Sequence, residues 1–255
     1  GGGDNMMGAI GTGNVKPGCI TASFGTSGTL YGVSDKPVID GQGEVAAFCD
    51  STDQWLPLVC TMNVTVVTEQ VCEMFRWNHQ QLEMAVKSAP VGADGVIFLP
   101  YLNGERTPNL PSGTGVLHGL RPTNMTPPNI ARAAVEGATL GLAYGLRRFR
   151  ELGMNPSEIR LTGGGSKSAT WRQIAADCFN AEVVTLSTSE GAALGAAIQA
   201  AHVATQQSYD SLCAKLVDLD ESTRCQPNAE NAAHYATQLD RQMELTGRLQ
   251  QTGWL

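Results

Sequence analysis

The sequence is short of basic residues and of long apolar runs. Its 255 residues include 17 Lys and Arg against 24 Asp and Glu, which gives a formal net charge of −7. Because there is no basic run, nucleic acid and anionic membrane surfaces are not expected partners. The most apolar stretch, EGAALGAAIQAAHVA, is too short to span a bilayer as a helix. A small molecule is therefore the expected ligand. If it carries a phosphate, backbone N–H groups or a metal would have to bind that phosphate.

Cysteine and histidine patterns that hold metals are missing as well. The seven cysteines are scattered, odd in number and form no CxxC motif, which argues against a disulfide framework or a zinc site. None of the four histidines lies at ligand spacing from another histidine or a cysteine. No basic start precedes an apolar run, so the sequence shows no signal peptide. We therefore expect a cytoplasmic protein without a structural metal site.

The composition is that of a folded α/β domain, with 42% hydrophobic and 16% charged residues. Strand signals dominate up to about residue 60, where a mainly antiparallel meander is expected, and strands and helices alternate afterwards. This order predicts a mixed sheet flanked by helices, followed from about residue 207 by a polar helical tail. Strands are expected within 19–34 (a hairpin), 44–50, 54–60, 95–100, 115–120, 158–163 and 182–186, and helices within 63–77, 79–89, 126–153, 168–179 and 190–203.

Glycines recur every four residues on two of the expected helices. Gly137, Gly141 and Gly145 lie on the long helix that Thr126 can cap, and Gly191 and Gly195 lie on the later one. A bare ridge of this kind predicts close backbone packing between two helices.

A tight turn and a triple glycine are candidate phosphate-binding elements. The stretch SFGTSGTL places Gly25, Thr26, Ser27 and Gly28 at a hairpin tip, where successive N–H groups form a concave anion site. An ordinary tight turn explains the same residues. The stretch LTGGGSKSATW ends a strand and opens a helix, so its glycines let a ligand approach a helix N-terminus. Spare glycines in a strand-to-helix turn are the alternative, since the stretch is neither GxGxxG nor a Walker sequence.

The first thirteen residues, GGGDNMMGAIGTG, contain a single acid, Asp4. A carboxylate in a glycine-walled cleft could act as a general base and accept the proton of an attacking hydroxyl. The alternative is a helix N-cap, which contributes roughly 1 kcal/mol to stability.

These stretches, in this order, resemble the C-terminal half of the FGGY carbohydrate kinases over about Gly1 to Val203. GGGDN, SFGTSGTL, FLPYLNGERTPN and LTGGGSKSATWRQIAADCFN all contribute to the resemblance. The most specific stretch matches the family signature in full: Gly115, Leu117, Gly119 and Leu120, then eight residues, then Asn129, Ile130, Ala133, Ala134, Val135 and Glu136. Within the family, the match is better to the kinases of D-xylulose than to glycerol kinases.

The resemblance implies a ribonuclease H-like fold of the actin, hexokinase and Hsp70 type, in which two domains enclose Mg-ATP and a sugar. Residues 1–255 would form the C-terminal nucleotide-binding domain. The chain does not begin with Met and its first motif lacks a preceding strand, so we expect a fragment whose N-terminal sugar-binding domain is absent. We expect the isolated fragment to be inactive, and a homodimer is one candidate assembly.

The resemblance also implies roles for single residues. Asp4 matches the catalytic base and also contacts the sugar, and Asn5 matches a sugar-contacting position. The hairpin residues Gly25, Thr26, Ser27 and Gly28 match the contacts to the ATP phosphates. No metal ligand is assigned within this chain.

On the nucleotide side, Gly164, Gly165 and Ser168 match the turn under the adenosine. The stretch TMNVTVVTEQ departs from the family pattern, so no adenine contact is assigned around Met62 and Asn63. The family loop that contains Glu105, Arg106 and Pro108 receives no role in the chemistry.

The implied reaction is the ATP-dependent phosphorylation of a ketopentose, D-xylulose at O5. A kinase of another sugar or polyol, such as glycerol, ribulose or gluconate, is the first alternative. The second is a non-catalytic nucleotide-binding module of the actin-like fold, against which an intact Asp4 argues.

Overall fold

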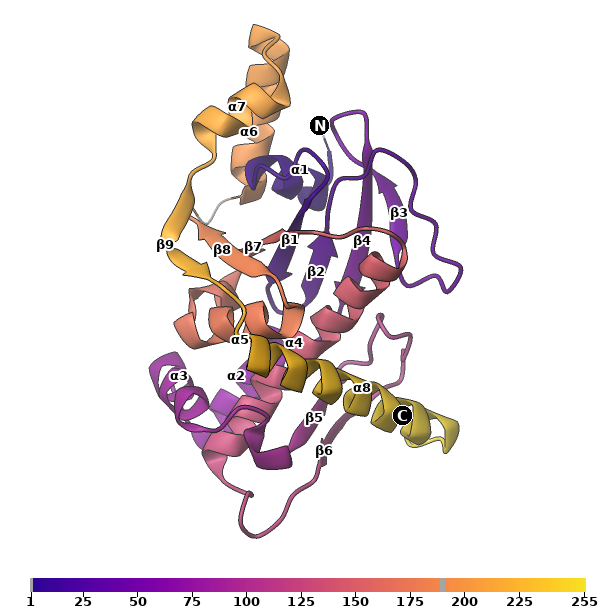
Figure 1. The fold of residues 1–255 in the computed structure, drawn as a ribbon, viewed down its shortest axis with the longest axis vertical. Coiled ribbons are helices and arrows are strands. Elements are labelled where there is room, and N and C mark those ends of the chain that lie inside the picture. The colour runs from indigo at the N-terminus through magenta and orange to yellow at the C-terminus, as the bar shows by residue number, and fades with distance from the viewer. Residues whose placement is uncertain (1, 189–190) are drawn as a thin grey trace.

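A computed structural model describes residues 2–188 and 191–255. Within these residues, seven strands form one mixed sheet in the order β3–β4–β2–β1–β7–β8–β9, and β5 pairs with β6 separately (Figure 1). The strands are β1 (Cys19–Phe24), β2 (Gly28–Tyr31), β3 (Ala46–Cys49), β4 (Trp55–Thr61), β5 (Ile97–Pro100), β6 (Gly115–His118), β7 (Glu158–Thr162), β8 (Glu182–Leu186) and β9 (Leu219–Cys225).

Helices cover both faces of the large sheet, and the expected mixed α/β architecture is confirmed. The first residue of the helix expected within 190–203 lies outside the described residues. The helices are α1 (Asp4–Gly11), α2 (Thr65–Phe75), α3 (His79–Ser88), α4 (Pro127–Glu151), α5 (Ala169–Phe179), α6 (Gly191–Thr205), α7 (Tyr209–Leu216) and α8 (Ala229–Gln251), with short 3₁₀ turns η1 (Ala93–Gly95) and η2 (Gly164–Lys167).

The strands of the first 60 residues are antiparallel, but they do not follow one another as a simple meander. The hairpin β1–β2 forms around Gly25–Ser27, with Phe24 opposite Gly28. β2 then pairs with β4, and β3 lies outside β4 at the sheet edge. On the other side, β1 runs parallel to β7. The parallel pairing joins the hairpin to the strand that carries the triple glycine.

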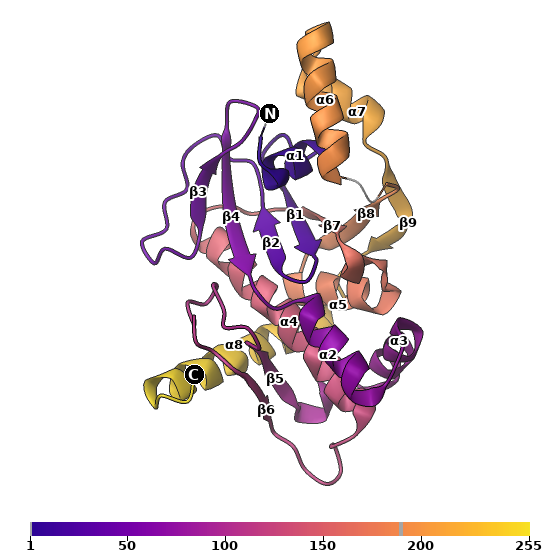
Figure 2. The ribbon, with the colours of Figure 1, turned by 180° about the vertical axis from the view of Figure 1, so that it is seen from behind.

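The two faces of the large sheet carry different side chains, because successive residues of a strand point to opposite faces. One face presents Ala22, Leu30 and Val59 to the main core, where α4 packs. The opposite face presents Tyr31 and Leu58 to α1. Figure 2 shows α4 and α2 side by side beneath the sheet, away from α1.

The long helix α4 begins as the sequence predicts. The Thr126 hydroxyl accepts a hydrogen bond from the N–H of Asn129 at 3.4 Å, and prolines occupy the first helical positions. Farther along, the Arg132 side chain forms an ion pair of 2.7 Å with Glu136, whose side chain is fully buried. Tyr235 of α8 donates to the same carboxylate at 2.7 Å. Glu136, the last residue of the family signature, thus joins two helices in the core.

The glycine ridge of α4 does not lie against another helix, so that prediction was wrong. A Cβ at Gly137 would overlap the backbone of Phe98 in β5, and one at Gly145 would meet Val59 of β4. The prediction is confirmed for α6, where a Cβ at Gly195 would overlap the backbone of Met7 and approach Gly11 in α1.

The tail is not entirely helical. The strand β9 forms between α7 and α8 and pairs antiparallel with β8. Its sequence, LDESTRC, has no apolar alternation, but Arg224 forms ion pairs with Glu158 of β7 and Glu182 of β8. Ion pairs with two other strands thus stabilise β9 in the sheet, in place of the apolar side chains that its sequence lacks. No helix within the described ranges is both long and apolar enough to cross a membrane.

Candidate functional site

The hairpin tip is held by the beginning of α2. The carbonyl oxygen of Gly25 accepts the N–H of Thr65 at 2.9 Å, and that of Thr26 accepts the N–H of Val64 at 3.0 Å. In a trans peptide unit the N–H points opposite to the C=O, so the N–H groups of Thr26 and Ser27 point away from α2. The side chains of both residues are exposed. The turn therefore offers donors to an anion on the side away from α2.

The triple glycine lies directly against this hairpin. Gly163 has a φ of 86°, and a Cβ there would stand 2.6 Å from the backbone carbonyl group of Phe24. Only glycine allows the two turns to approach so closely. The structure therefore brings the two glycine-containing turns that the sequence singles out into contact.

A cavity of about 790 Å³ opens beside the triple glycine, between α2, α3 and the start of α5. Thr65, which binds the hairpin, belongs to its wall. The lining is mixed, with apolar side chains from α3, α4 and α5 and polar ones at the rim. It comprises Thr65, Thr68, Glu69, His79, Gln80, Leu82, Glu83, Met84, Val86, Val135, Gly164, Gly165, Lys167, Ser168, Ala169 and Trp171.

The two glycines predicted under the adenosine differ in their surroundings. A Cβ at Gly164 would meet no atom within 4 Å, so this position faces open space. A Cβ at Gly165 would stand 3.1 Å from Phe24 and 3.1 Å from Trp171, so this position faces the core. Gly164 is therefore the position that a ligand in the cavity can approach, and Gly165 keeps η2 packed on the core.

Ser168 lies at the rim of the cavity, and its hydroxyl already has two partners. It accepts the N–H of Trp171 at 3.0 Å as the N-cap of α5, and it donates to Glu83 of α3. Thr170 also donates to Glu83, from its N–H at 2.9 Å and its hydroxyl at 2.6 Å. Burial raises the pKa of Glu83, but these hydrogen bonds outweigh burial and hold it below 4.5. The first residues of α5 thus hold α3 in place through Glu83, and α3 forms one wall of the cavity.

The segment around Met62 and Asn63 turns away from the cavity. Asn63 is buried, and its amide group donates to the Gly104 carbonyl at 2.6 Å and to Glu105 at 3.0 Å. The Met62 N–H donates to Glu105 at 2.6 Å. The first residues of the departing stretch therefore lie in a contact between the end of β4 and the loop that contains Arg106. Its later residues Thr65, Thr68 and Glu69 belong to α2 and line the cavity.

Asp4 begins α1 and does not cap it, so the capping alternative is wrong. The N-cap is Gly3, which makes no side-chain capping bond. The Asp4 carboxylate is exposed and accepts only the N–H of Asn5, at 2.9 Å, among the described residues. Burial raises the pKa of Tyr31, and the charge of Asp4 raises it further. The carboxylate therefore stands near β2 and keeps oxygen atoms available for a ligand.

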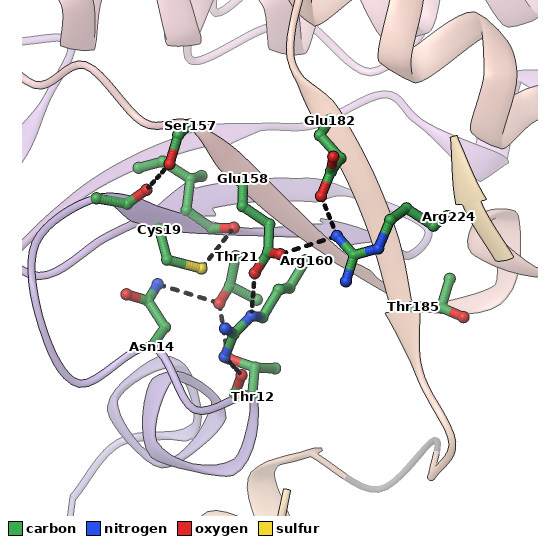
Figure 3. A network of polar contacts seen from close by, with 12 residues as sticks. Thr12, Asn14, Cys19, Thr21, Ser157, Glu158, Arg160, Glu182, Thr185 and Arg224 are labelled. Carbon is green, nitrogen blue, oxygen red and sulfur yellow. Dashed lines mark hydrogen bonds and ion pairs between the residues drawn. The ribbon is translucent and has the colours of Figure 1, made fainter. Parts of the chain in front are cut away.

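The opposite end of α1 is anchored to the sheet (Figure 3). The Thr12 hydroxyl is hydrogen-bonded to that of Thr21 in β1 at 2.7 Å, and the Asn14 amide donates to Thr21 at 3.2 Å. Arg160 of β7 donates to the Thr12 carbonyl and pairs with Glu158 at 2.9 Å. These contacts fix the helix that carries Asp4 and Asn5.

A row of small polar side chains lies between α1 and the hairpin tip, on the same face of the sheet. The register places Thr162, Ser23, Thr29 and Cys60 side by side on β7, β1, β2 and β4. Along β2, the four steps from Tyr31 beneath α1 to the hairpin tip span about 13 Å. No local sequence pattern predicts this row, because only the strand register brings its members together.

The Thr29 hydroxyl of this row is buried and has no hydrogen-bond partner within the described residues. A buried hydroxyl without a partner is costly, so it marks a place where a ligand can supply the missing bond. The described residues contain no group of three or more His, Cys, Asp or Glu that could hold a metal ion. Mg²⁺ needs only one or two carboxylates when phosphates complete its coordination, and Asp4 is an available carboxylate.

The sequence and the fold both match known proteins. Residues 20–204 match the C-terminal domain of the FGGY family of carbohydrate kinases. The chain is 45% identical over 241 residues to a xylulose kinase from Haemophilus influenzae, covering 94% of this chain and 49% of that protein. A xyloylose kinase structure from Brucella ovis aligns with a TM-score of 0.91 and 26% identity, covering 99% of this chain and 52% of that one.

A gluconate kinase structure from Lactobacillus acidophilus aligns with a TM-score of 0.88 and 25% identity, covering 95% of this chain and 50% of that one. The chain therefore spans about half the length of the curated relatives it matches. The described helices and strands have the actin-like fold of these kinases. Because the family match extends over most of the chain, the chain belongs to the FGGY family of carbohydrate kinases.

Proposed function

We propose that residues 1–255 form the C-terminal, nucleotide-binding domain of an ATP-dependent kinase that phosphorylates D-xylulose at O5. The observation that carries this proposal is the meeting of the two glycine-containing turns beside one cavity, with the Asp4 carboxylate across the same sheet. Relatives named xylulose kinase, 45% identical in one case, support the choice of sugar.

In this proposal the adenosine lies in the cavity against Gly164, where no side chain intervenes. The phosphates extend to the hairpin, whose N–H groups and exposed Thr26 and Ser27 hydroxyls donate to them. Mg²⁺, when bound, neutralises phosphate charge and orients the transferred group. Gly165 and Ser168 support this site through packing and capping rather than through direct contact.

The sugar lies over the polar row, between Asp4 and the hairpin, with Asn5 beside it. Asp4 accepts the proton of the attacking hydroxyl as its oxygen approaches the γ-phosphorus in line. The donors at Gly25–Gly28 stabilise the charge on the phosphoryl oxygens. A second domain is required to enclose the reactants and exclude water.

Two alternatives remain testable. The gluconate kinase structure named above supports a family member acting on another sugar or polyol. A non-catalytic nucleotide-binding module would bind ATP in the same cavity, but it would have no use for the free carboxylate of Asp4.

An ADP-release assay on the complete protein tests the proposal. The substrates are D-xylulose, D-ribulose, gluconate and glycerol at equal concentrations, with ATP and Mg²⁺. We expect the highest kcat/KM with D-xylulose. A higher value with another substrate would identify the first alternative, and ATP binding without turnover on any substrate would identify the second. A cytoplasmic location and a homodimer also stay predictions, which cell fractionation and light scattering would check.

A further inference from the structure

Arg106 stands on a loop that a buried carboxylate holds in place. The neighbouring Glu105 is only 5% exposed. Its oxygens accept the N–H of Met62 at 2.6 Å, the side-chain amide of Asn63 at 3.0 Å and the N–H of Arg106 at 2.8 Å. Burial raises the pKa of Glu105, against the effect of these bonds. Glu105 is thus occupied in fixing the loop, and Arg106 is the charge that the loop presents to solvent.

The loop is tied to the end of β4, beside the polar row, because Glu105 accepts the N–H of Met62, two residues after Cys60. Burial raises the pKa of the Cys60 thiol, and the nearby charge of Arg106 lowers it in part. Cys60 belongs to the face that carries α1, since it packs against the cluster that contains Ala9 of α1, Tyr31 and Leu58. Arg106 therefore lies on the same side of the sheet as Asp4.

Two groups at this place lack partners. Arg106 is exposed and forms no ion pair with any residue of 2–188 and 191–255. The strand register puts Thr29, whose buried hydroxyl is also unpaired, directly beside Cys60. The next pair in that register is Gly28 with Thr61, where the hairpin turn begins. A cation without an ion-pair partner and a hydroxyl without a hydrogen-bond partner thus adjoin the turn that offers N–H groups to phosphate.

We propose that Arg106 is a catalytic residue that binds the phosphoryl group during its transfer, opposite the hairpin N–H groups. This inference rests on the proposed kinase function. In the loose transition state of phosphoryl transfer, negative charge is spread over three equatorial oxygens. A planar guanidinium can bind two of them at once, and it stays charged at every working pH. The hairpin holds one side of the group, and Arg106 holds the other.

The reaction balances without a contribution of protons from Arg106. A bond forms between the sugar O5 and the γ-phosphorus, and the bond from that phosphorus to the bridging oxygen breaks. The electron pair of the broken bond leaves with ADP, and the sugar proton passes to Asp4. Nothing is oxidised or reduced, and the guanidinium acts only through charge and hydrogen bonds.

The test uses the complete enzyme with Arg106→Gln and Arg106→Lys. We expect Arg106→Gln to lower kcat about 1,000-fold, the lower end of the effect of arginines that serve phosphoryl transfer. The KM for D-xylulose should stay within about threefold, because the sugar itself does not contact Arg106. Arg106→Lys should recover only part of kcat, since an ammonium group cannot bind two oxygens in a fork. Arg241→Gln, at an exposed arginine of α8, is the matched control.

Calorimetry provides a readout that does not depend on turnover. Arg106→Gln should weaken binding of D-xylulose 5-phosphate at least about tenfold, equivalent to about 1.4 kcal/mol, and should leave binding of D-xylulose unchanged. A kcat for Arg106→Gln within about threefold of wild type would overturn the inference while the kinase function stands. A wild-type enzyme that neither binds nor phosphorylates any sugar of the panel would overturn the proposed function, and this inference with it.

Discussion

The two sides of the candidate site, which we propose for the nucleotide and for the sugar, are built differently. The proposed nucleotide side is a cavity with walls from α2, α3, η2 and α5, in which a part-buried hydrogen bond from Ser168 to Glu83 joins α5 to α3. The sugar side is a single sheet face with one helix across it, on which Asp4 and Arg106 are exposed. A binding site can therefore be formed within this chain on the first side, whereas the second side offers one wall only.

The largest effect should come from testing the 255-residue chain alone. We expect it to bind ATP weakly and to transfer no measurable phosphate to D-xylulose. Holding both reactants in register contributes on the order of 7–11 kcal/mol to catalysis, and one open wall cannot hold the sugar. An ADP-release assay measures this against the complete enzyme. Turnover in the usual enzyme range of about 1–1,000 per second would remove the distinction between the two sides.

The next effect concerns Asp4 in the complete enzyme. Asp4→Asn should lower turnover by about 100- to 10,000-fold, because asparagine cannot accept the proton. The thermal midpoint should hardly change, since the N-cap is Gly3 and an exposed first-turn carboxylate contributes only about 0.3–1 kcal/mol through the helix dipole. Near-normal turnover with saturating ketopentose would return Asp4 to a structural role.

Substitutions at Gly164 and Gly165, two adjacent glycines of η2, test ligand contact and core packing separately. Gly165→Val should destabilise the protein by about 1–3 kcal/mol, because the added atoms meet Phe24 and Trp171. At about 2–4 °C per kcal/mol for a chain of this size, the loss should appear in a thermal melt. A variant as stable as the parent would show that the core side of the turn tolerates side chains.

Gly164→Val should instead leave stability unchanged and weaken ATP binding. A Cβ at Gly164, which lines the cavity, meets no atom within 4 Å, so the thermal midpoint should stay near that of the parent. ATP affinity measured by calorimetry should fall at least about tenfold, equivalent to about 1.4 kcal/mol. Unchanged ATP affinity would place the adenosine elsewhere.

The smallest effect should come from Ser168→Ala. Loss of the α5 cap should cost about 0.5–2 kcal/mol of stability, with ATP affinity nearly unchanged if Ser168 acts only on the walls. The low pKa of Glu83 implies stability that is present above its unfolded-state pKa and is lost as the pH falls through the lower folded-state value. Removing the Ser168 hydroxyl, one of the donors to Glu83, should therefore reduce the loss of stability that occurs as the pH falls. A larger loss of ATP affinity than of stability would make Ser168 a direct ligand contact.

The sequence predicts the parts of this site that depend on local patterns. The hairpin, the cap of α4 and the strand-to-helix turn at Gly163–Gly165 all follow from turn and capping residues a few positions apart. The direction of each Cβ does not, so sequence alone could not distinguish Gly164 from Gly165. The row from Thr162 to Cys60 needs the pairing of four strands, and β9 depends on charges of two other strands. Such long-range relations have no signal in a short window of sequence.

The crossing of α1 and α6 has a consequence for how the chain tolerates substitution. Gly11 and Gly195 meet backbone to backbone, so a single methyl group at Gly195 would have to push the two helices apart. The N-terminal turn of α1 would tilt with it, because the other end is tied to the sheet through Thr12. In a deep mutational scan of the complete enzyme, Gly195 should therefore be as intolerant of replacement as a residue in contact with substrate. A map of sensitive positions drawn for this fold would extend along α6, a helix that touches neither turn nor cavity.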